Sequence, residues 1–127
     1  MSRYLLDTDV LINYSKGREP ATSRIQHLID QGDELGVCAV NVAEFFAGIA
    51  PANRPYWTTV FSTFTYWEIS PAVAQHAGEL RYDFARQGQI LSTTDTLIAA
   101  VAMHKGAILV TGNVKHYPMG GIQLMAL

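Results

Sequence analysis

The sequence predicts an α/β protein in which helices cover both faces of a parallel sheet. Five short apolar runs, typical of buried strands, alternate along the chain with segments that have the spacing of helices. Prolines stand where three of these helices are expected to begin, and glycines stand where several are expected to end. Strand and helix alternation favours a parallel sheet, because parallel strands need a crossover connection, usually a helix, between them.

The expected elements follow from these patterns. Strands are predicted at residues 3–6, 35–39, 66–69, 107–111 and 122–125. Helices are predicted at residues 10–15, 21–30, 41–47, 55–64, 71–86 and 94–104. We expect each boundary to be right to within about two to four residues. If the first strand is central and strand 107–111 lies beside it, their carboxyl ends flank one crevice.

Length and composition limit the classes of function. The 127 residues fit one domain, spanning 1–127, with 49% hydrophobic and only 16% charged residues. So little charge predicts apolar surface that is buried in a homodimer or against another partner. A net charge of -2 excludes a broad basic surface for nucleic acid, but it permits a local basic rim. The candidates for such a rim are Lys16, Arg18, Lys105 and Lys115.

Compartment is predicted from cysteine usage and from the first residues. The sole cysteine, Cys38, cannot form an internal disulfide, which favours the reducing cytoplasm. Asp7 and Asp9 interrupt the first apolar run, which therefore lacks the long hydrophobic region of a signal peptide. No run approaches the roughly 18 apolar residues of a membrane span, so no membrane association is expected.

Three acidic residues stand at the ends of predicted elements. Asp7 directly follows the first strand, Glu44 lies in the helix after the second, and Asp95 opens the helix before the fourth. Carboxylates that converge repel each other by about 4 kcal/mol per pair at 4 Å and an effective dielectric constant of 20, unless a cation lies among them. Oxygen ligands without a cysteine or histidine set favour Mg²⁺ or Mn²⁺. Such an ion can activate water and bind a phosphodiester.

Each acid also has a purely structural interpretation. Asn41 and Glu44 have the spacing of a capping box, in which Asn41 would be the N-cap. Asp95 would complement the dipole of its own helix, and Asp9 would cap a helix beginning at Val10. Asp7 fits a structural role least well, because a carboxylate next to a buried strand is costly unless it is paired or metal-bound.

Four segments in order resemble the motifs of PIN-domain ribonucleases, and more narrowly of VapC-type toxins of bacterial toxin–antitoxin pairs. They are Asp7-Thr8-Asp9-Val10-Leu11-Ile12, Asn41-Val42-Ala43-Glu44-Phe45, Thr94-Asp95-Thr96-Leu97-Ile98-Ala99-Ala100 and Leu109-Val110-Thr111-Gly112-Asn113-Val114-Lys115-His116-Tyr117. Any one motif is weak evidence, but the ordered set spans nearly the whole chain.

The resemblance implies a PIN-like three-layer α/β/α fold with a five-stranded parallel sheet. It implies Mg²⁺- or Mn²⁺-dependent cleavage of RNA, homodimerisation, and inhibition by a small cognate VapB-type antitoxin protein. On matching positions, Asp7, Glu44 and Asp95 take the acidic, metal-binding roles, and Thr111 takes the hydroxyl role beside Asp7. Many family members have a fourth acid at the position of Asn113. An asparagine there offers a carbonyl oxygen but no charge, which weakens the case for a second metal ion.

Other residues and functions have alternative interpretations. His116 is predicted to be a solvated loop residue, and the aromatic residues between Tyr56 and Trp67 are predicted to pack in the core or a dimer interface. A non-catalytic interaction domain and a phosphatase with Asp7 as nucleophile remain open. A phospho-accepting signalling domain is disfavoured, because it needs an acid after the third strand, where Ser70 and Pro71 are expected. Asp7→Asn is expected to abolish cleavage while leaving the fold intact or more stable.

Overall fold

The computed structural model describes residues 1–127 and contains a five-stranded sheet that is parallel throughout. The strands lie in the order β3-β2-β1-β4-β5, with β1 in the middle. Their bounds are β1 Arg3–Leu6, β2 Glu34–Cys38, β3 Thr65–Trp67, β4 Ile108–Thr111 and β5 Gln123–Ala126. The predicted parallel sheet, its central first strand and the neighbouring strand after the last helix are all confirmed.

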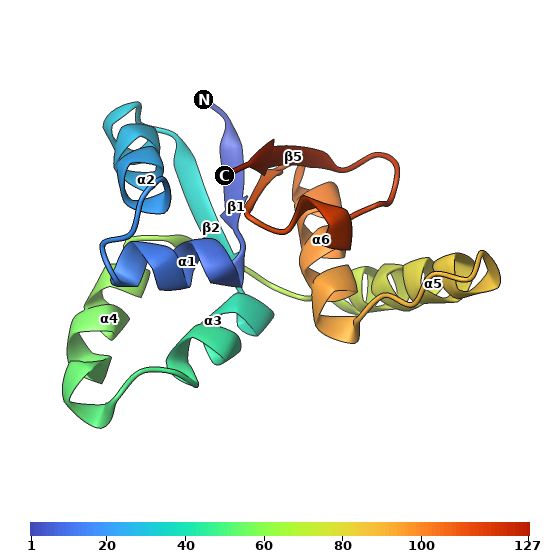
Figure 1. Ribbon diagram of the computed structural model, residues 1–127, viewed down its shortest axis with the longest axis horizontal. Helices are drawn as coiled ribbons and strands as arrows, with labels where there is room; N and C mark the ends of the chain where they lie inside the picture. Colours follow the sequence, from blue (N-terminus) through green and yellow to red (C-terminus); the bar gives the residue numbers. More distant parts are fainter.

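Six α-helices form the layers on either side of the sheet (Figure 1). Helices α1 to α4 gather on one side and α5 and α6 on the other, with the sheet between them. Their bounds are α1 Thr8–Ser15, α2 Ala21–Asp30, α3 Ala39–Phe46, α4 Arg54–Phe61, α5 Pro71–Arg86 and α6 Thr93–Lys105. Two short 3₁₀ turns, Pro51–Asn53 and Val114–His116, complete the chain. The expected three-layer α/β/α architecture is confirmed.

The two faces of the sheet bury different side chains. Beneath α5 and α6 the core contains many small residues, including the consecutive Ala99, Ala100, Val101 and Ala102 of α6. Beneath α1 to α4 it contains Leu6, Val10, Ile25 and Phe45, with aromatic side chains of α4 packed against them. Because α6 presents mainly alanines, it can lie close to the sheet, and this close packing fixes the helix that carries Asp95.

Of the aromatic residues between Tyr56 and Trp67, three pack against the core on the α1–α4 side, namely Trp57, Phe61 and Phe64, whereas Trp67 belongs to the core beneath α5 and α6. The ring of Phe45 lies 5.4 Å from that of Trp57 and 4.8 Å from that of Phe61, measured between centroids. These distances are those of favourable aromatic pairs. The prediction of core packing is therefore confirmed for Trp57 and Phe61, whereas Tyr56 and Tyr66 remain largely exposed.

Several local predictions differ from the structure. Helix α3 begins at Ala39 after the N-cap Cys38, so Asn41 is inside the helix and the predicted capping box with Glu44 is wrong. Helix α1 begins at Thr8 with Asp7 as its N-cap, so Asp9 does not cap it. In both places the sequence pattern favours a polar side chain close to the helix start as the cap, although the structure starts the helix two residues earlier.

Lys105, a candidate for the basic rim, lies near the amino end of β1, whereas the acidic residues gather at the carboxyl ends of the strands. Its carbonyl oxygen accepts a hydrogen bond from Arg3, the first residue of β1, at 3.1 Å. Helix α6 has 13 residues and is about 20 Å long. Lys105 in its last turn therefore cannot share a site with Asp95 in its first turn. No helix is long and apolar enough to span a membrane.

Candidate active site

The candidate site lies beyond the carboxyl ends of β1 and β4, where the strand order changes direction. From β1, the chain continues on one side to β2 and β3 and returns on the other to β4 and β5. Crevices at such switch points are where open α/β sheets bind their ligands. Leu6 of β1 pairs with Val110 of β4, so Asp7 and Thr111 follow at the same level of the sheet.

Asp7 forms the floor of this site and is only 5% exposed. Its Oδ1 accepts a hydrogen bond from the backbone N–H of Thr8 at 2.8 Å. Its Oδ2 accepts from the hydroxyl of Thr111 at 2.7 Å and from the hydroxyl of Tyr117 at 2.9 Å. Three donors compensate the buried charge, which explains how a carboxylate is tolerated at the tip of a core strand.

Thr111 is held in place by the turn that follows β4. The backbone N–H of Asn113 donates to the Thr111 hydroxyl at 2.9 Å, and that hydroxyl donates in turn to Asp7. Such a chain of hydrogen bonds is mutually polarising in a buried setting. The predicted hydroxyl role of Thr111 beside Asp7 is therefore supported by direct contact, while Asn113 contributes its backbone to the site.

Tyr117 lies among the carboxylates; it is the last residue of the fourth motif, but the resemblance assigns it no role. Its side chain is buried, and its hydroxyl lies 2.9 Å from Asp7 and 3.5 Å from Oδ1 of Asp95. Burial, followed by the negative charges of Asp7 and Asp95, raises the pKa of Tyr117 far above its ordinary value. The hydroxyl therefore stays protonated and acts as a donor between two acids.

Asp9 faces the same turn from the first turn of α1. Its Oδ2 accepts a hydrogen bond from the backbone N–H of Gly112 at 3.0 Å, and its buried Oδ1 has no partner. A Cβ atom at position 112 would lie 2.5 Å from Oδ2, so this contact requires glycine. Burial, together with the charge of Asp7, raises the pKa of Asp9. Asp9 therefore supports the turn after β4 at an electrostatic cost.

Glu44 reaches the site from α3 and is exposed. Its Oε1 accepts a hydrogen bond from the hydroxyl of Thr8 at 2.7 Å, which places it one residue from Asp7. The capping contact expected of Glu44 is made instead by Asn41, whose Oδ1 accepts from the backbone N–H of Cys38 at 2.8 Å. Glu44 is thus free of any helix-capping role and projects toward the end of β1.

Asp95 approaches from the first turn of α6. Ser92 is the N-cap of this helix, and its hydroxyl oxygen accepts from the backbone N–H of Asp95 at 3.1 Å. The carboxylate faces the Tyr117 hydroxyl on one side and Nδ1 of His116, at 3.4 Å from Oδ2, on the other. His116 is exposed, as predicted for a solvated residue, and its ring also lies beside a site carboxylate.

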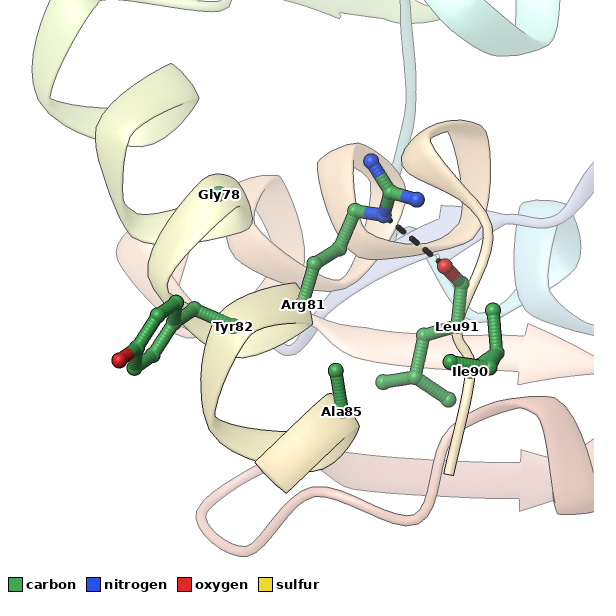
Figure 2. Close-up of a pocket in the computed structure, with 6 residues that line it drawn as sticks. All are labelled: Gly78, Arg81, Tyr82, Ala85, Ile90 and Leu91. Carbon is green, nitrogen blue, oxygen red and sulfur yellow. Dashed lines mark hydrogen bonds between the residues drawn. The ribbon is translucent and has the colours of Figure 1, made fainter. Parts of the chain in front are cut away.

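The start of α6 is anchored by an arginine from the neighbouring helix (Figure 2). Nε of Arg81, on α5, donates to the carbonyl oxygen of Leu91 at 2.9 Å, one residue before the N-cap. The two groups line a hollow of about 270 Å³, and none of the site carboxylates lies in it. The acidic site is therefore separate from this hollow.

The carboxylates of Asp7, Glu44 and Asp95 are suitable ligands for a hard divalent cation, although they do not converge on one point in this structure. No three histidine, cysteine, aspartate or glutamate side chains lie close enough together to hold a metal ion. Hydroxyl groups of Tyr117 and Thr8 stand beside the carboxylates that would have to converge. The unpartnered Oδ1 of Asp9 shows that negative charge at this edge is incompletely compensated. Carboxylate oxygens of this kind suit Mg²⁺ or Mn²⁺.

Comparison with known proteins agrees with this geometry. The family model described as "PIN domain" matches residues 4–120, which include every residue of the site. "Ribonuclease VapC10" of Mycobacterium tuberculosis is 30% identical over 115 residues, covering 91% of this chain and 86% of the relative. "tRNA(fMet)-specific endonuclease VapC" of Shigella flexneri is 28% identical over 129 residues, covering 97% and 96%.

Solved structures show the same fold. The structure described as VapBC2 from Rickettsia felis bound to a promoter DNA fragment has a TM-score of 0.85 at 22% identity, covering 98% of both chains. A toxin–antitoxin complex from Klebsiella pneumoniae has a TM-score of 0.73 at 25% identity, covering 94% of both. Because the family model matches residues 4–120 and curated relatives align over nearly the whole chain, the chain belongs to the PIN-domain family and resembles its VapC ribonucleases throughout its length.

Proposed function

We propose that this protein is a metal-dependent endoribonuclease that hydrolyses RNA phosphodiesters and acts as the toxin of a type II toxin–antitoxin pair. The observation that carries the proposal is the contact of Asp7 with Thr111 and Tyr117, and of Tyr117 with Asp95, at the switch point of a PIN fold. Relatives named as ribonucleases or endonucleases that align over nearly the whole chain support it.

Mg²⁺ or Mn²⁺ is the proposed cofactor, and Asp7, Glu44 and Asp95 are the residues that would hold it, directly or through water. Such an ion supplies positive charge for the phosphate oxygens and lowers the pKa of the attacking water. Oδ1 of Asp7 accepts one hydrogen bond, whereas Oδ2 accepts two, so Oδ1 has more lone-pair capacity left to bind an ion. Glu44 and Asp95 are the more exposed acids and have room to turn toward it.

The remaining residues position these carboxylates and the RNA. Thr111 and Tyr117 fix Asp7, so its oxygens do not have to be ordered during the reaction. His116 is half-exposed beside Asp95 and can donate to a phosphate oxygen. Asn113 is only partly buried, and its side chain can orient a water molecule.

We further propose that the protein forms a homodimer, is inhibited by a small VapB-type antitoxin and acts in the cytoplasm. Solved relatives described as VapBC complexes support such a partner. A basic residue of the antitoxin, most suitably arginine, would pair with the carboxylates of the site. The single cysteine is buried and free, as is ordinary for a protein in a reducing compartment.

The alternative functions are less compatible with these contacts. Asp7 as a phosphatase nucleophile would have to give up hydrogen bonds, and Asp9, the acid two residues on, is bound to Gly112. The third strand ends at Trp67, so an acid, Glu68, does follow it, contrary to prediction. That strand is at the edge of the sheet, however, two strands from β1, which disfavours a phospho-accepting site. A non-catalytic domain is excluded only by measured cleavage.

The decisive experiment is cleavage of RNA by the purified protein with Mg²⁺, with Mn²⁺ and with a chelator. We expect products only with a divalent ion, and we expect Asp95→Asn to abolish them. Asp83→Asn, at an exposed acid on α5, is the matched control and should cleave normally. Cleavage that persists in the Asp95→Asn protein would point to a contaminating nuclease or to another mechanism.

The toxin role has a separate test in cells. The chain is induced alone and then together with the adjacent reading frame, and RNA ends are sequenced after a short induction. Arrested growth that the neighbouring product relieves, and that Asp95→Asn prevents, is the expected result. If RNA and growth are unaffected while the purified protein cleaves RNA, the enzyme assignment stands and the toxin assignment fails.

A further inference from the structure

A pair of histidines joins α5 to α6 on the side of the molecule that the acidic site does not use. Nδ1 of His76 lies 3.0 Å from Nε2 of His104, and the ring centroids are 5.1 Å apart. His76 lies in the first half of α5, and His104 lies in the last turn of α6, far along that helix from Asp95. Neither residue is buried, so both rings are accessible to an ion from solvent.

We propose that His76 and His104 form a second metal site, which takes a divalent transition-metal ion that prefers nitrogen ligands. Imidazole suits Cu²⁺, Ni²⁺ and Zn²⁺, whereas the oxygen-seeking Mg²⁺ has no ligand of its preferred kind here. The site is independent of the proposed function, because it shares no residue with the carboxylates at the other end of α6.

The two rings share a hydrogen bond, in which one of the two nitrogens carries the proton, and that proton passes to solvent when an ion binds. The separation of the two nitrogens then fits chelation of one ion. With metal–nitrogen bonds of about 2.05 Å, nitrogens 3.0 Å apart subtend an angle of about 94° at the metal. This angle is close to that of tetragonal or octahedral sites, which Cu²⁺ and Ni²⁺ adopt, and smaller than the tetrahedral angle of Zn²⁺. Water molecules complete the coordination, since no third histidine, cysteine or acid is grouped with the pair.

The local structure favours a cation at this position. His104 lies in the last turn of α6, where the partial negative charge of the helix end stabilises positive charge. The rings are tilted by 52° to each other, and aiming both lone pairs at one ion requires rotation about χ2 torsions, which are broad for histidine. Helix α5 and helix α6 already pack through Val73, Ala77 and the alanines of α6, so the backbone positions are fixed.

An ion bound by both residues would link two helices across their contact. Because it binds the folded chain and finds no preformed pair in the unfolded chain, it would raise the melting temperature increasingly as its concentration rises. The ion would stabilise the packing of α5 on α6. At the other end of this helix pair, Arg81 and Ser92 hold the start of α6, which carries Asp95.

The test uses the full chain without a polyhistidine tag, in excess Mg²⁺ so that the carboxylates are saturated. Cu²⁺ and Ni²⁺ are titrated by calorimetry, and bound Cu²⁺ is examined by electron paramagnetic resonance. We expect one equivalent of the metal ion to bind per chain, and we expect the resonance spectrum of bound Cu²⁺ to show hyperfine coupling to nitrogen. His76→Ala and His104→Ala should each weaken binding by at least about tenfold and remove the rise in melting temperature.

His27→Ala is the matched control, since His27 is exposed on α2 and has no histidine neighbour. It should bind the ion like the unmodified protein. Circular dichroism of each variant separates loss of the site from loss of the fold. Equal affinity in the His76→Ala and His104→Ala proteins, absence of saturable binding in the unmodified protein, or loss of binding on His27→Ala would each overturn the proposal.

Discussion

The floor and the rim of the acidic site are built in different ways. Asp7, Thr111 and Tyr117 form the floor, where all three side chains are buried and joined by hydrogen bonds of 2.7 and 2.9 Å. Glu44 and Asp95 form the rim, where both side chains are more exposed and have long or single contacts. The sheet fixes the floor, whereas the rim residues retain freedom to adjust to an ion or to RNA.

This difference predicts how mutations should separate activity from stability. Residues of the floor contribute to both, because their polar groups are buried and mutually satisfied. Residues of the rim contribute to activity with little effect on folding, because water can replace their partners.

The largest effect is expected at the floor, for Asp7→Asn. Cleavage should fall by at least about a hundredfold, and the free energy of unfolding should fall by about 1–3 kcal/mol, because an amide nitrogen would face two hydroxyl donors or the Thr8 N–H. The three hydrogen bonds of Asp7 thus argue against the sequence-based expectation of an intact or stabilised fold. Cleavage assays and urea unfolding check the two effects, and a more stable variant would restore the sequence-based expectation.

Rim variants should lose activity to a similar degree and keep their stability. For Glu44→Gln and Asp95→Asn we expect the free energy of unfolding to stay within about 0.5 kcal/mol of the unmodified protein. In the Glu44→Gln protein the amide carbonyl oxygen of the new side chain can still accept from the Thr8 hydroxyl, which makes this change especially mild. Urea unfolding measures the free energy of unfolding of each variant, and cleavage assays measure its activity. A large loss of stability would show that the rim residues are as important for folding as the floor residues.

Tyr117→Phe should give an intermediate loss of cleavage and a loss of stability similar to that of Asp7→Asn. The change removes one donor from Asp7 and the contact to Asp95 while it keeps the buried ring. Hydrogen bonds to charged groups contribute about 1.5–3 kcal/mol, so we expect a loss of stability in this range and a reduction of cleavage of about tenfold. Tyr82→Phe, at an exposed tyrosine of α5, is the control that should change neither property.

Asn113→Asp should tighten binding of Mn²⁺ by a few-fold, since it adds a carboxylate next to the floor. The backbone N–H of residue 113 can still donate to Thr111, so the turn should be retained. Calorimetric titration with Mn²⁺ measures the change. Unchanged or weaker affinity would mean that this side chain points away from the proposed metal.

The smallest effect is expected for Asp9→Asn, as a slight rise in melting temperature at pH 7. Burial and the charge of Asp7 raise the pKa of Asp9, so the Asp9 carboxyl group binds its proton more tightly in the folded protein than in the unfolded chain. Stability of the unmodified protein therefore decreases as the pH rises from the ordinary value of 3.8 through the raised pKa. The advantage of the variant should grow over this window, stay constant above it and vanish below it. Melting curves at pH 3, 5 and 7 test the trend.

The order of layers and most element positions were predictable from local sequence. Arg3–Leu6, Ala21–Asp30 and Pro71–Arg86 have the predicted bounds, because apolar spacing and flanking prolines or glycines act over a few residues. The starts of α1 and α3 were less predictable. There the chain passes from strand to helix without a break, and polar residues just inside each helix imitate a cap.

The acids themselves were also predictable, since Asp7, Glu44 and Asp95 stand at element ends in an ordered set of motifs. Their partners were not. Tyr117 and His116 lie more than twenty residues from Asp95, and only the packing of the turn after β4 against α6 brings their rings to the carboxylate. His76 and His104 likewise lie 28 residues apart and meet only because α5 packs on α6.

Sequence by itself determined which groups carry charge and which segments form strands and helices, because those properties are local. Tertiary structure decided which donors satisfy each buried charge. A hydrogen bond forms only when the donor–acceptor distance is right to within a few tenths of an ångström, and here the donors and acceptors are remote from each other in the chain.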